Sequence, residues 1–276
     1  MSFGKRLGEL VDRFGPFCPG IDPHAALLKS WGLADDVAGL RVFAQICVEA
    51  FGGQVAIVKP QSAFFERFGS AGIAVLEDVL AGLREAGTLS LLDVKRGDIG
   101  STMGGYADAY LSDASPLRAD AITVSPYLGF GSVQPALDLA ADTRRGVFVL
   151  ALTSNPEAAH VQQATYDGRA VAADVIDRVG RLNASADRFG DVGMVVGATT
   201  GKQLADLGLT DALADAKAPL LAPGVGAQGA TFDDVRRGFG PAASLVLPAS
   251  SREVLAAGPD VAGLRQAARA GNEAAR

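Results

Sequence analysis

The chain has 276 residues, a formal net charge of −6 and a sequence pI near 5.0. Hydrophobic residues make up 49% of it, which is enough for a large buried core and excludes an intrinsically disordered chain. The acidic balance argues against a nucleic-acid partner or an acidic membrane surface, so an anionic ligand would need a local basic pocket. The first residues lack the long apolar run of a signal peptide, and no stretch of about 18 apolar residues could span a membrane. We therefore expect a cytoplasmic protein.

Short aliphatic runs alternate with longer helical stretches along the whole chain. The eight runs cover residues 17–21, 54–59, 89–95, 121–125, 147–153, 193–198, 219–222 and 244–248. Eight βα units in a chain of this length predict a closed (βα)8 TIM barrel, and a doubly wound open sheet is the alternative. No Pro/Ser-rich linker or low-complexity tract divides the sequence, so we expect residues 1–276 to form a single domain.

Helices are predicted between these runs, where apolar residues recur at helical spacing. The clearest cover residues 35–52, 72–86 and 167–190. The segment 154–166 is longer than an ordinary βα turn and contains an Asn-Pro pair. It is a lid, a ligand-contacting loop or a surface insertion.

Charged residues gather where the second and third runs end. Asp93 and Lys95 are two residues apart, so their side chains share one face of a strand, and Asp98 follows just beyond. Lys59 ends the second run. Any one of these residues could belong to a structural ion pair, but a buried array of alternating Lys and Asp costs several kcal/mol of desolvation unless a function requires it. Carboxylates keep neighbouring ammonium groups protonated, and a protonated lysine beside a substrate atom is a proton donor.

The residues after the seventh run, 224–229, read Gly-Val-Gly-Ala-Gln-Gly and match G-x-G-x-x-G. A dinucleotide site is the weaker interpretation, because the match lies in the seventh βα unit and not in an opening one. A phosphate held by backbone N–H groups is the stronger interpretation. Arg252 follows the eighth run, where a guanidinium suits a phosphate, and a surface arginine is the alternative. Asp22, after the first run, could cap a helix or bind a sugar hydroxyl.

Metal and disulfide chemistry are not indicated. His24 and His160 are far apart, and no cluster has zinc-ligand spacing. Cys18 and Cys47 fit no metal motif, so we expect both to be buried and reduced.

The stretch Asp93-Val-Lys95-Arg-Gly-Asp98-Ile resembles the D-x-K-x-x-D-I signature of the orotidine 5′-phosphate decarboxylase family. Its continuation through Thr102 resembles the longer bacterial branch of that family. Lys59, Ser125, the 223–229 loop and Arg252 agree with the same pattern. Met103 and Gly104 depart from it, as does the segment 248–252.

The resemblance implies a homodimer with shared active sites. It implies decarboxylation of orotidine 5′-monophosphate to uridine 5′-monophosphate in pyrimidine biosynthesis, without metal or organic cofactor. Carried over by position, it places Asp93 at the departing carboxylate, Lys95 as proton donor to C6 of the pyrimidine, and Lys59 at the charge array and the ribose.

The resemblance also implies binding roles outside this array. Asp98 and Thr102 would reach into the partner subunit's site. Asp22 would bind the ribose and Ser125 the pyrimidine, while Gly226, Gln228 and Arg252 would lie at the phosphate end.

Two other functions stay open on the same scaffold. One is a magnesium-dependent sugar-phosphate aldolase or decarboxylase such as 3-hexulose-6-phosphate synthase, which would carry an acidic metal ligand on the second strand, where Lys59 stands. The other is a nucleotide-binding protein without catalysis.

Overall fold

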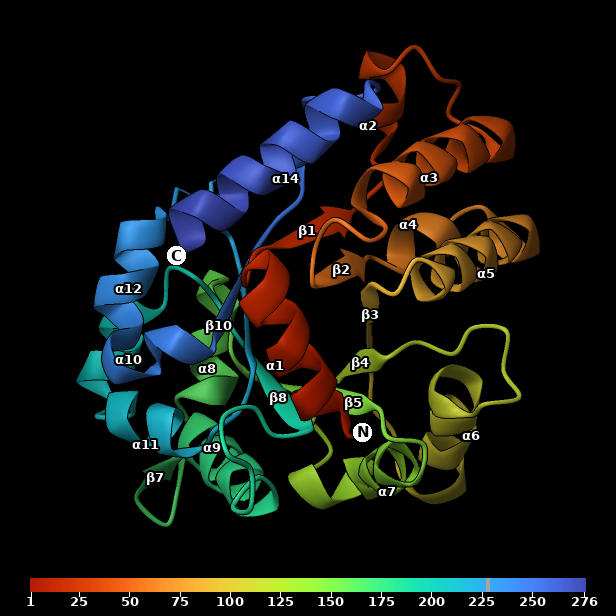
Figure 1. Cartoon of the computed structure of the whole chain (residues 1–276). Helices are drawn as coiled ribbons and strands as arrows, with labels where there is room; N and C mark the ends of the chain where they lie inside the picture. Colours follow the sequence, from red (N-terminus) through yellow and green to blue (C-terminus); the bar gives the residue numbers. More distant parts are fainter. Residues whose placement is uncertain (227–228) are drawn as a thin grey trace.

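The structure is a computed structural model and describes residues 1–226 and 229–276. Within them, eight parallel strands close into a barrel in the order β1-β10-β9-β8-β5-β4-β3-β2 (Figure 1). The strands are β1 (Cys18–Ile21), β2 (Ile57–Pro60), β3 (Leu89–Arg96), β4 (Ala121–Val124), β5 (Gly146–Leu152), β8 (Val192–Val196), β9 (Leu220–Pro223) and β10 (Val246–Ser250). The predicted (βα)8 barrel is confirmed, and the open sheet is not formed.

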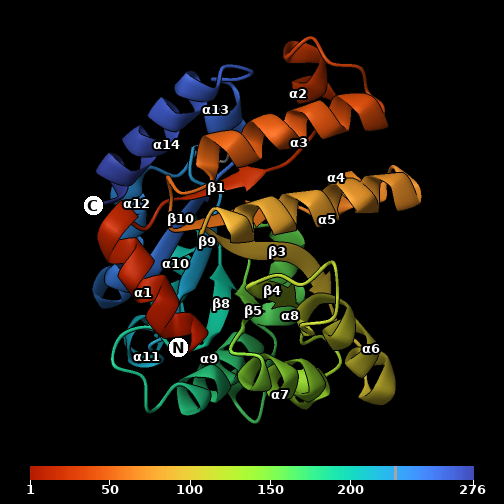
Figure 2. The ribbon, with the colours of Figure 1, turned by 45° about the vertical axis from the view of Figure 1, so that its right-hand side comes forward.

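Helices surround the strands on the outside of the barrel (Figure 2). They are α1 (Phe3–Phe14), α2 (Ala25–Ser30), α3 (Val37–Phe51), α4 (Ala63–Glu66), α5 (Gly69–Glu85), α6 (Gly100–Leu111), α7 (Gln134–Asp142), α8 (Ala159–Gln162), α9 (Val171–Leu182), α10 (Gly201–Asp206), α11 (Thr210–Asp215), α12 (Phe232–Phe239), α13 (Arg252–Leu255) and α14 (Val261–Ala275). Short 3-10 turns are η1 (Phe130–Val133), η2 (Pro156–Ala158) and η3 (Gly240–Leu245), and β6 (Thr165–Tyr166) pairs with β7 (Arg169–Ala170) in a separate hairpin.

Each predicted run overlaps one barrel strand, but some boundaries move. β2 begins at Ile57 and not at residue 54, because residues 52–54 form a turn after α3. β10 begins at Val246 and continues to Ser250, since η3 occupies the residues before it. The aliphatic pattern therefore located the strands, while their ends depend on neighbouring turns.

Two of the three predicted helices are confirmed as α3 and α5. The third is shorter than predicted at both ends, since α9 covers only Val171–Leu182. Its predicted first residues form the β6–β7 hairpin instead. At the other end the Asn183 amide donates to the carbonyls of Val192 (2.8 Å) and Ala216 (3.1 Å), and so directs the chain toward β8.

Helix α1 closes the amino-terminal end of the barrel, where it lies across the ring of strands in Figure 1. Phe3 is fully buried and packs edge-on against Phe148 of β5, with ring centroids 6.0 Å apart. The Gly4 amide donates to Asp191 at 2.7 Å. Gly146 has to be glycine, because a Cβ there would lie 2.6 Å from the Phe3 ring. The opposite end, at the carboxyl ends of the strands, is left for a cavity.

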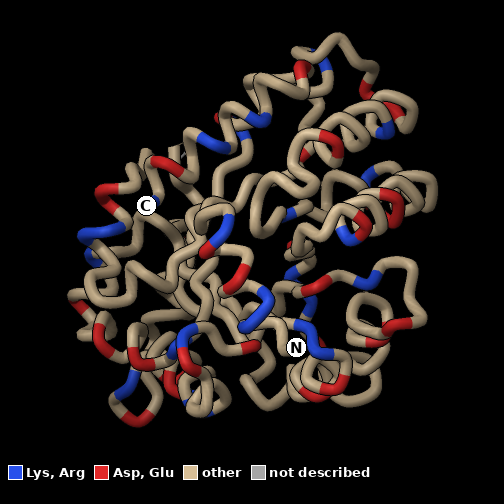
Figure 3. Tube along the Cα trace, viewed as in Figure 1, with Lys and Arg blue, Asp and Glu red and all other residues tan. Residues whose placement is uncertain are grey.

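Acidic and basic residues are interspersed along the whole trace (Figure 3). No helix in the described part of the chain is both long and apolar enough to cross a membrane. Cys18 and Cys47 are free and buried, as predicted, and burial raises the pKa of the Cys18 thiol to about 12.

Candidate active site

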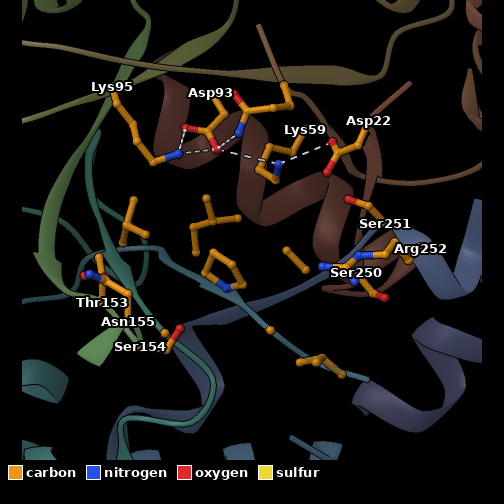
Figure 4. A pocket seen from close by; sticks show the side chains of 18 of the residues that line it. Asp22, Lys59, Asp93, Lys95, Thr153, Ser154, Asn155, Ser250, Ser251 and Arg252 are labelled. Carbon is orange, nitrogen blue, oxygen red and sulfur yellow. Dashed lines mark hydrogen bonds and ion pairs between the residues drawn. The ribbon is translucent and has the colours of Figure 1, made fainter. Parts of the chain in front are cut away.

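A cavity of about 440 Å³ opens at the carboxyl ends of the barrel strands, a size typical of small-molecule sites. Its lining residues include Asp22, His24, Lys59, Gln61, Phe64, Asp93, Lys95, Thr153, Ser154, Asn155, Pro223, Gly224, Val225, Ser250, Ser251 and Arg252. Figure 4 shows four charged side chains in a row along one side, with 153–155 opposite them. The residues 250–252 lie near the Asp22 end of this row.

The row is a continuous chain of ion pairs that runs across β1, β2 and β3. Lys59 Nζ lies 3.7 Å from Asp22 Oδ1 and 3.7 Å from Asp93 Oδ2. Lys95 Nζ lies 2.6 Å from Asp93 Oδ1 and 2.7 Å from Asp93 Oδ2. The order is Asp22, Lys59, Asp93, Lys95, so the signs of charge alternate along it.

Asp93 lies at the centre of a saturated hydrogen-bond network. The Gln61 amide donates to Oδ2 at 2.8 Å, and the Thr123 hydroxyl donates to Oδ1 at 2.8 Å. Burial by itself raises the pKa of Asp93, but the ammonium groups of Lys59 and Lys95 together with these hydrogen bonds lower it below the ordinary value. The carboxylate is therefore held ionised in a buried position.

The two lysines have different surroundings. The Lys59 side chain is 7% exposed, and that of Lys95 is 47% exposed. Burial lowers the pKa of Lys59, but the Asp22 and Asp93 carboxylates outweigh this and leave the pKa raised. Lys59 is thus a fixed buried cation, whereas the Lys95 ammonium is accessible from the cavity.

Four of the ten predicted site residues, namely Asp22, Lys59, Asp93 and Lys95, form this row, and Arg252 joins them in the cavity wall. The second carboxylate of the row is Asp22, next to Lys59, and not Asp98 as predicted. The Asp98 carboxylate instead accepts a hydrogen bond from the Ile99 amide at 2.8 Å.

Three other predicted residues lie outside the cavity lining, and one is not described. Thr102 is exposed on α6, and Ser125 follows β4 with its amide donating to the Arg96 carbonyl at 2.8 Å. Gly226 adjoins the lining residue Val225. It has φ +76°, and a Cβ there would lie 1.9 Å from Glu253 Oε2. Gln228 lies outside the described residues.

Sequence reasoning missed Gln61 and Thr123 as partners of Asp93. Thr123 carried a weak signal, because it is a polar residue within an otherwise aliphatic strand. Gln61 follows the Lys59-Pro60 pair directly, so its position just beyond the end of β2 was the feature that could have indicated a site residue.

The Arg252 end of the cavity contains polar atoms with free bonding capacity. Of the buried side-chain atoms in the described residues that have no hydrogen-bond partner, Asp22 Oδ1 and Ser250 Oγ belong to residues of the cavity lining. Thr153 and Asn155 line the opposite wall, and the Thr153 hydroxyl donates to the Asn155 side-chain oxygen at 2.7 Å. Of the three interpretations of segment 154–166, ligand contact by its first residues agrees best with this position. A polar ligand would thus be surrounded by hydrogen-bonding groups.

Across residues 1–226 and 229–276, no three His, Cys, Asp or Glu side chains are placed together to hold a metal ion. The cavity carboxylates Asp22 and Asp93 are both paired with Lys59. His24 packs against Phe64 with ring centroids 4.0 Å apart, and burial lowers its pKa.

Comparisons with known proteins agree with this geometry. The family described as Orotidine 5′-phosphate decarboxylase / HUMPS matches residues 9–267. An orotidine 5′-phosphate decarboxylase of Salinispora arenicola is 62% identical over 268 residues, which cover 97% of this chain and 94% of that protein. The Streptomyces coelicolor protein of the same name is 54% identical, with 96% and 94% covered.

Solved structures give the same result. A crystal structure from Streptomyces avermitilis, described provisionally as an orotidine 5′-phosphate decarboxylase, superposes with a TM-score of 0.94 at 54% identity. The superposition covers 100% of this chain and 95% of the Streptomyces avermitilis chain. The Leishmania donovani OMP decarboxylase superposes with a TM-score of 0.74 at 30% identity, with 100% and 99% covered.

Proposed function

The chain belongs to the orotidine 5′-phosphate decarboxylase / HUMPS family, and from that premise we propose that it converts orotidine 5′-monophosphate to uridine 5′-monophosphate with Lys95 as the proton donor. It is an enzyme of the carboxy-lyase class, and its relatives act in pyrimidine biosynthesis. The observation that carries the proposal is the Lys95 ammonium, which lies 2.6 Å from the buried Asp93 carboxylate and is open to the cavity.

The reaction breaks the bond between C6 and the carboxylate, and its electron pair stays on C6. A negative charge develops there with little resonance relief, so catalysis requires a positive charge already fixed beside it. The Lys95 ammonium supplies that charge and then donates its proton to C6, which forms the new C–H bond. Solvent returns a proton to the lysine.

The rest of the row supports this step. Asp93 holds Lys95 in place and lies close to the position proposed for the substrate carboxylate, which it repels until carbon dioxide leaves. Lys59 lies between Asp22 and Asp93 and balances both charges. We assign ribose contacts to Asp22 and Lys59 and the phosphate end to Arg252 with the loop that includes Gly226 and Gln228.

A homodimer with shared sites is part of the proposal. We assign Asp98 and Thr102, which follow β3 outside the cavity lining of their own chain, to the partner subunit's site. Ser125, which follows β4, is assigned to the pyrimidine. Large apolar side chains are exposed in the same region, namely Ile99 (62%), Tyr127 (76%) and Leu128 (54%). Exposed apolar clusters of this kind are typical of protein interfaces, and a second copy would cover them.

The proposed reaction uses no metal or organic cofactor, unlike a magnesium-dependent aldolase or decarboxylase of the same scaffold. The Lys59 ammonium between Asp22 and Asp93 supports this, because it occupies the position where such an enzyme would place an acidic ligand. The test is the loss of orotidine monophosphate absorbance in excess EDTA. Unchanged turnover is expected.

Each contrary result would point to a named alternative. Turnover that disappears in EDTA and returns with Mg²⁺ would overturn the metal-free mechanism. Binding of uridine monophosphate without any decarboxylation would instead indicate a nucleotide-binding protein.

A further inference from the structure

Thr123 makes every hydrogen bond that its hydroxyl permits, although it does not line the cavity. The side chain is fully buried in the middle of β4. Its Oγ1 donates to Asp93 Oδ1 at 2.8 Å and accepts from the backbone N–H groups of Val94 (3.1 Å) and Lys95 (2.9 Å). A threonine hydroxyl has one donor and two acceptor positions, so its capacity is complete.

These contacts lie where β3 and β4 lose their regular pairing. Leu92 pairs with Ile122, and Arg96 pairs with Val124. Three residues of β3 therefore lie opposite the single residue Thr123, which makes the irregularity a bulge. The backbone N–H groups of Val94 and Lys95 face the Thr123 side chain and donate to its hydroxyl.

The bulge also gives Lys95 an unusual backbone. Its φ is +45°, in the left-handed region that residues with a Cβ avoid unless the surroundings enforce it. With this backbone the Lys95 side chain folds back onto Asp93, two residues earlier on the same strand. The same hydroxyl thus fixes both the backbone that presents the ammonium and the carboxylate that receives it.

We propose that Thr123 is the positioning residue that holds the β3 bulge, so that the Lys95 ammonium is presented to the substrate in its reactive orientation. It acts through Lys95 and Asp93 without touching the substrate. This inference rests on the proposed decarboxylase function.

The test compares three variants in the full-length protein. Thr123→Val keeps the shape and removes the hydroxyl, whereas Thr123→Ser keeps the hydroxyl. The matched control is Thr88→Val, because Thr88 is equally buried and its hydroxyl accepts from the Gly53 amide at 2.8 Å and donates to the Val55 carbonyl at 3.3 Å. Thr88 precedes β3 at the other end of the barrel. We measure kcat, KM and the thermal unfolding midpoint, with active sites counted by binding of uridine monophosphate.

We expect Thr123→Val to lower kcat by about tenfold to a hundredfold, the scale of a reacting group displaced by about 1 Å. KM should change much less, because the ribose and phosphate contacts remain. Thr123→Ser should restore kcat to within about threefold of the wild type, since a hydroxyl again satisfies both amides. Thr88→Val should lower the unfolding midpoint and leave kcat unchanged.

Two results would overturn the inference. One is a folded Thr123→Val protein with wild-type kcat. The other is a Thr123→Ser protein that loses kcat tenfold or more, which remains decisive if the valine variant does not fold. If the wild type itself fails to decarboxylate orotidine monophosphate, the proposed function fails, and that failure is separate from these outcomes.

Discussion

The Lys95 ammonium contacts both carboxylate oxygens of Asp93, at 2.6 and 2.7 Å, although the Lys95 side chain is 47% exposed and that of Asp93 only 6%. A half-exposed lysine in the cavity wall is thus paired with a buried, hydrogen-bonded carboxylate. Preorganisation of this kind is what electrostatic catalysis requires, because the charge need not reorient during the reaction.

Removal of this ammonium should abolish turnover without unfolding the protein. In Lys95→Ala we expect kcat to fall by at least about a thousandfold, since the variant loses a proton donor and a fixed charge together. Absorbance assays give the rate, and circular dichroism reports the fold. Lys202→Ala is the matched control, because Lys202 is an exposed lysine on α10 that pairs with Asp206. Near-normal turnover in Lys95→Ala would rule out its role as donor.

Removal of the buried cation should change both stability and its pH dependence. Lys59→Met leaves Asp22 and Asp93 without their shared partner, and loss of one member of a buried pair costs about 3–5 kcal/mol. In the wild type the folded-state pKa of Asp93 is lowered. Its contribution to the free energy of unfolding is therefore complete at pH values above its unfolded-state pKa of about 3.9, and it is lost as the pH falls through the folded-state pKa.

Without Lys59 the folded-state pKa of Asp93 moves up toward or above its unfolded value, so the stability lost on acidification should be smaller in Lys59→Met than in the wild type. Urea unfolding from pH 3 to 7 measures this. An equal loss of unfolding free energy on acidification in both proteins would contradict the electrostatic account of the row.

The phosphate assignment of Arg252 makes a prediction that depends on the substrate. Arg252→Ala should lower kcat/KM for orotidine monophosphate by about tenfold to a hundredfold, the value of one charge-assisted hydrogen bond of about 1.5–3 kcal/mol. Orotidine, which has no phosphate, should be turned over equally slowly by the wild type and by Arg252→Ala. An equal loss with both substrates would mean that Arg252 supports the cavity wall instead.

Shared sites predict complementation between inactive variants. Lys95→Ala and Asp98→Ala each disable both sites of their own homodimer. In a mixed dimer one site combines an intact Lys95 with the partner's intact Asp98, so an equal mixture should regain about a quarter of the wild-type activity. Mass spectrometry of the mixture confirms heterodimers. Their presence without recovered activity would show that each site is formed by one chain.

The position of Lys59, Asp93 and Lys95 could be predicted because parallel strands bring their carboxyl ends to one face of a barrel. The role of Thr123 could not, since it depends on a bulge between β3 and β4 that leaves no trace in the hydrophobic pattern. Asp22 was predicted as a sugar ligand or helix cap, and its ion pair with Lys59 depends on the pairing of β1 with β2. The ends of α9 depend on the β6–β7 hairpin and on the Asn183 amide, which are tertiary contacts outside helical periodicity.

The contacts of α1 also bear on the order in which the chain assembles. Arg6 pairs with Asp120 at 2.6 Å, and the Gly4 amide binds Asp191 at 2.7 Å, across 114 and 187 residues of sequence. Helix α1 therefore has no docking surface until most of the barrel that follows it has been synthesised. Contacts of such long range form late in folding, so we expect this helix to dock after the strands that it covers have assembled.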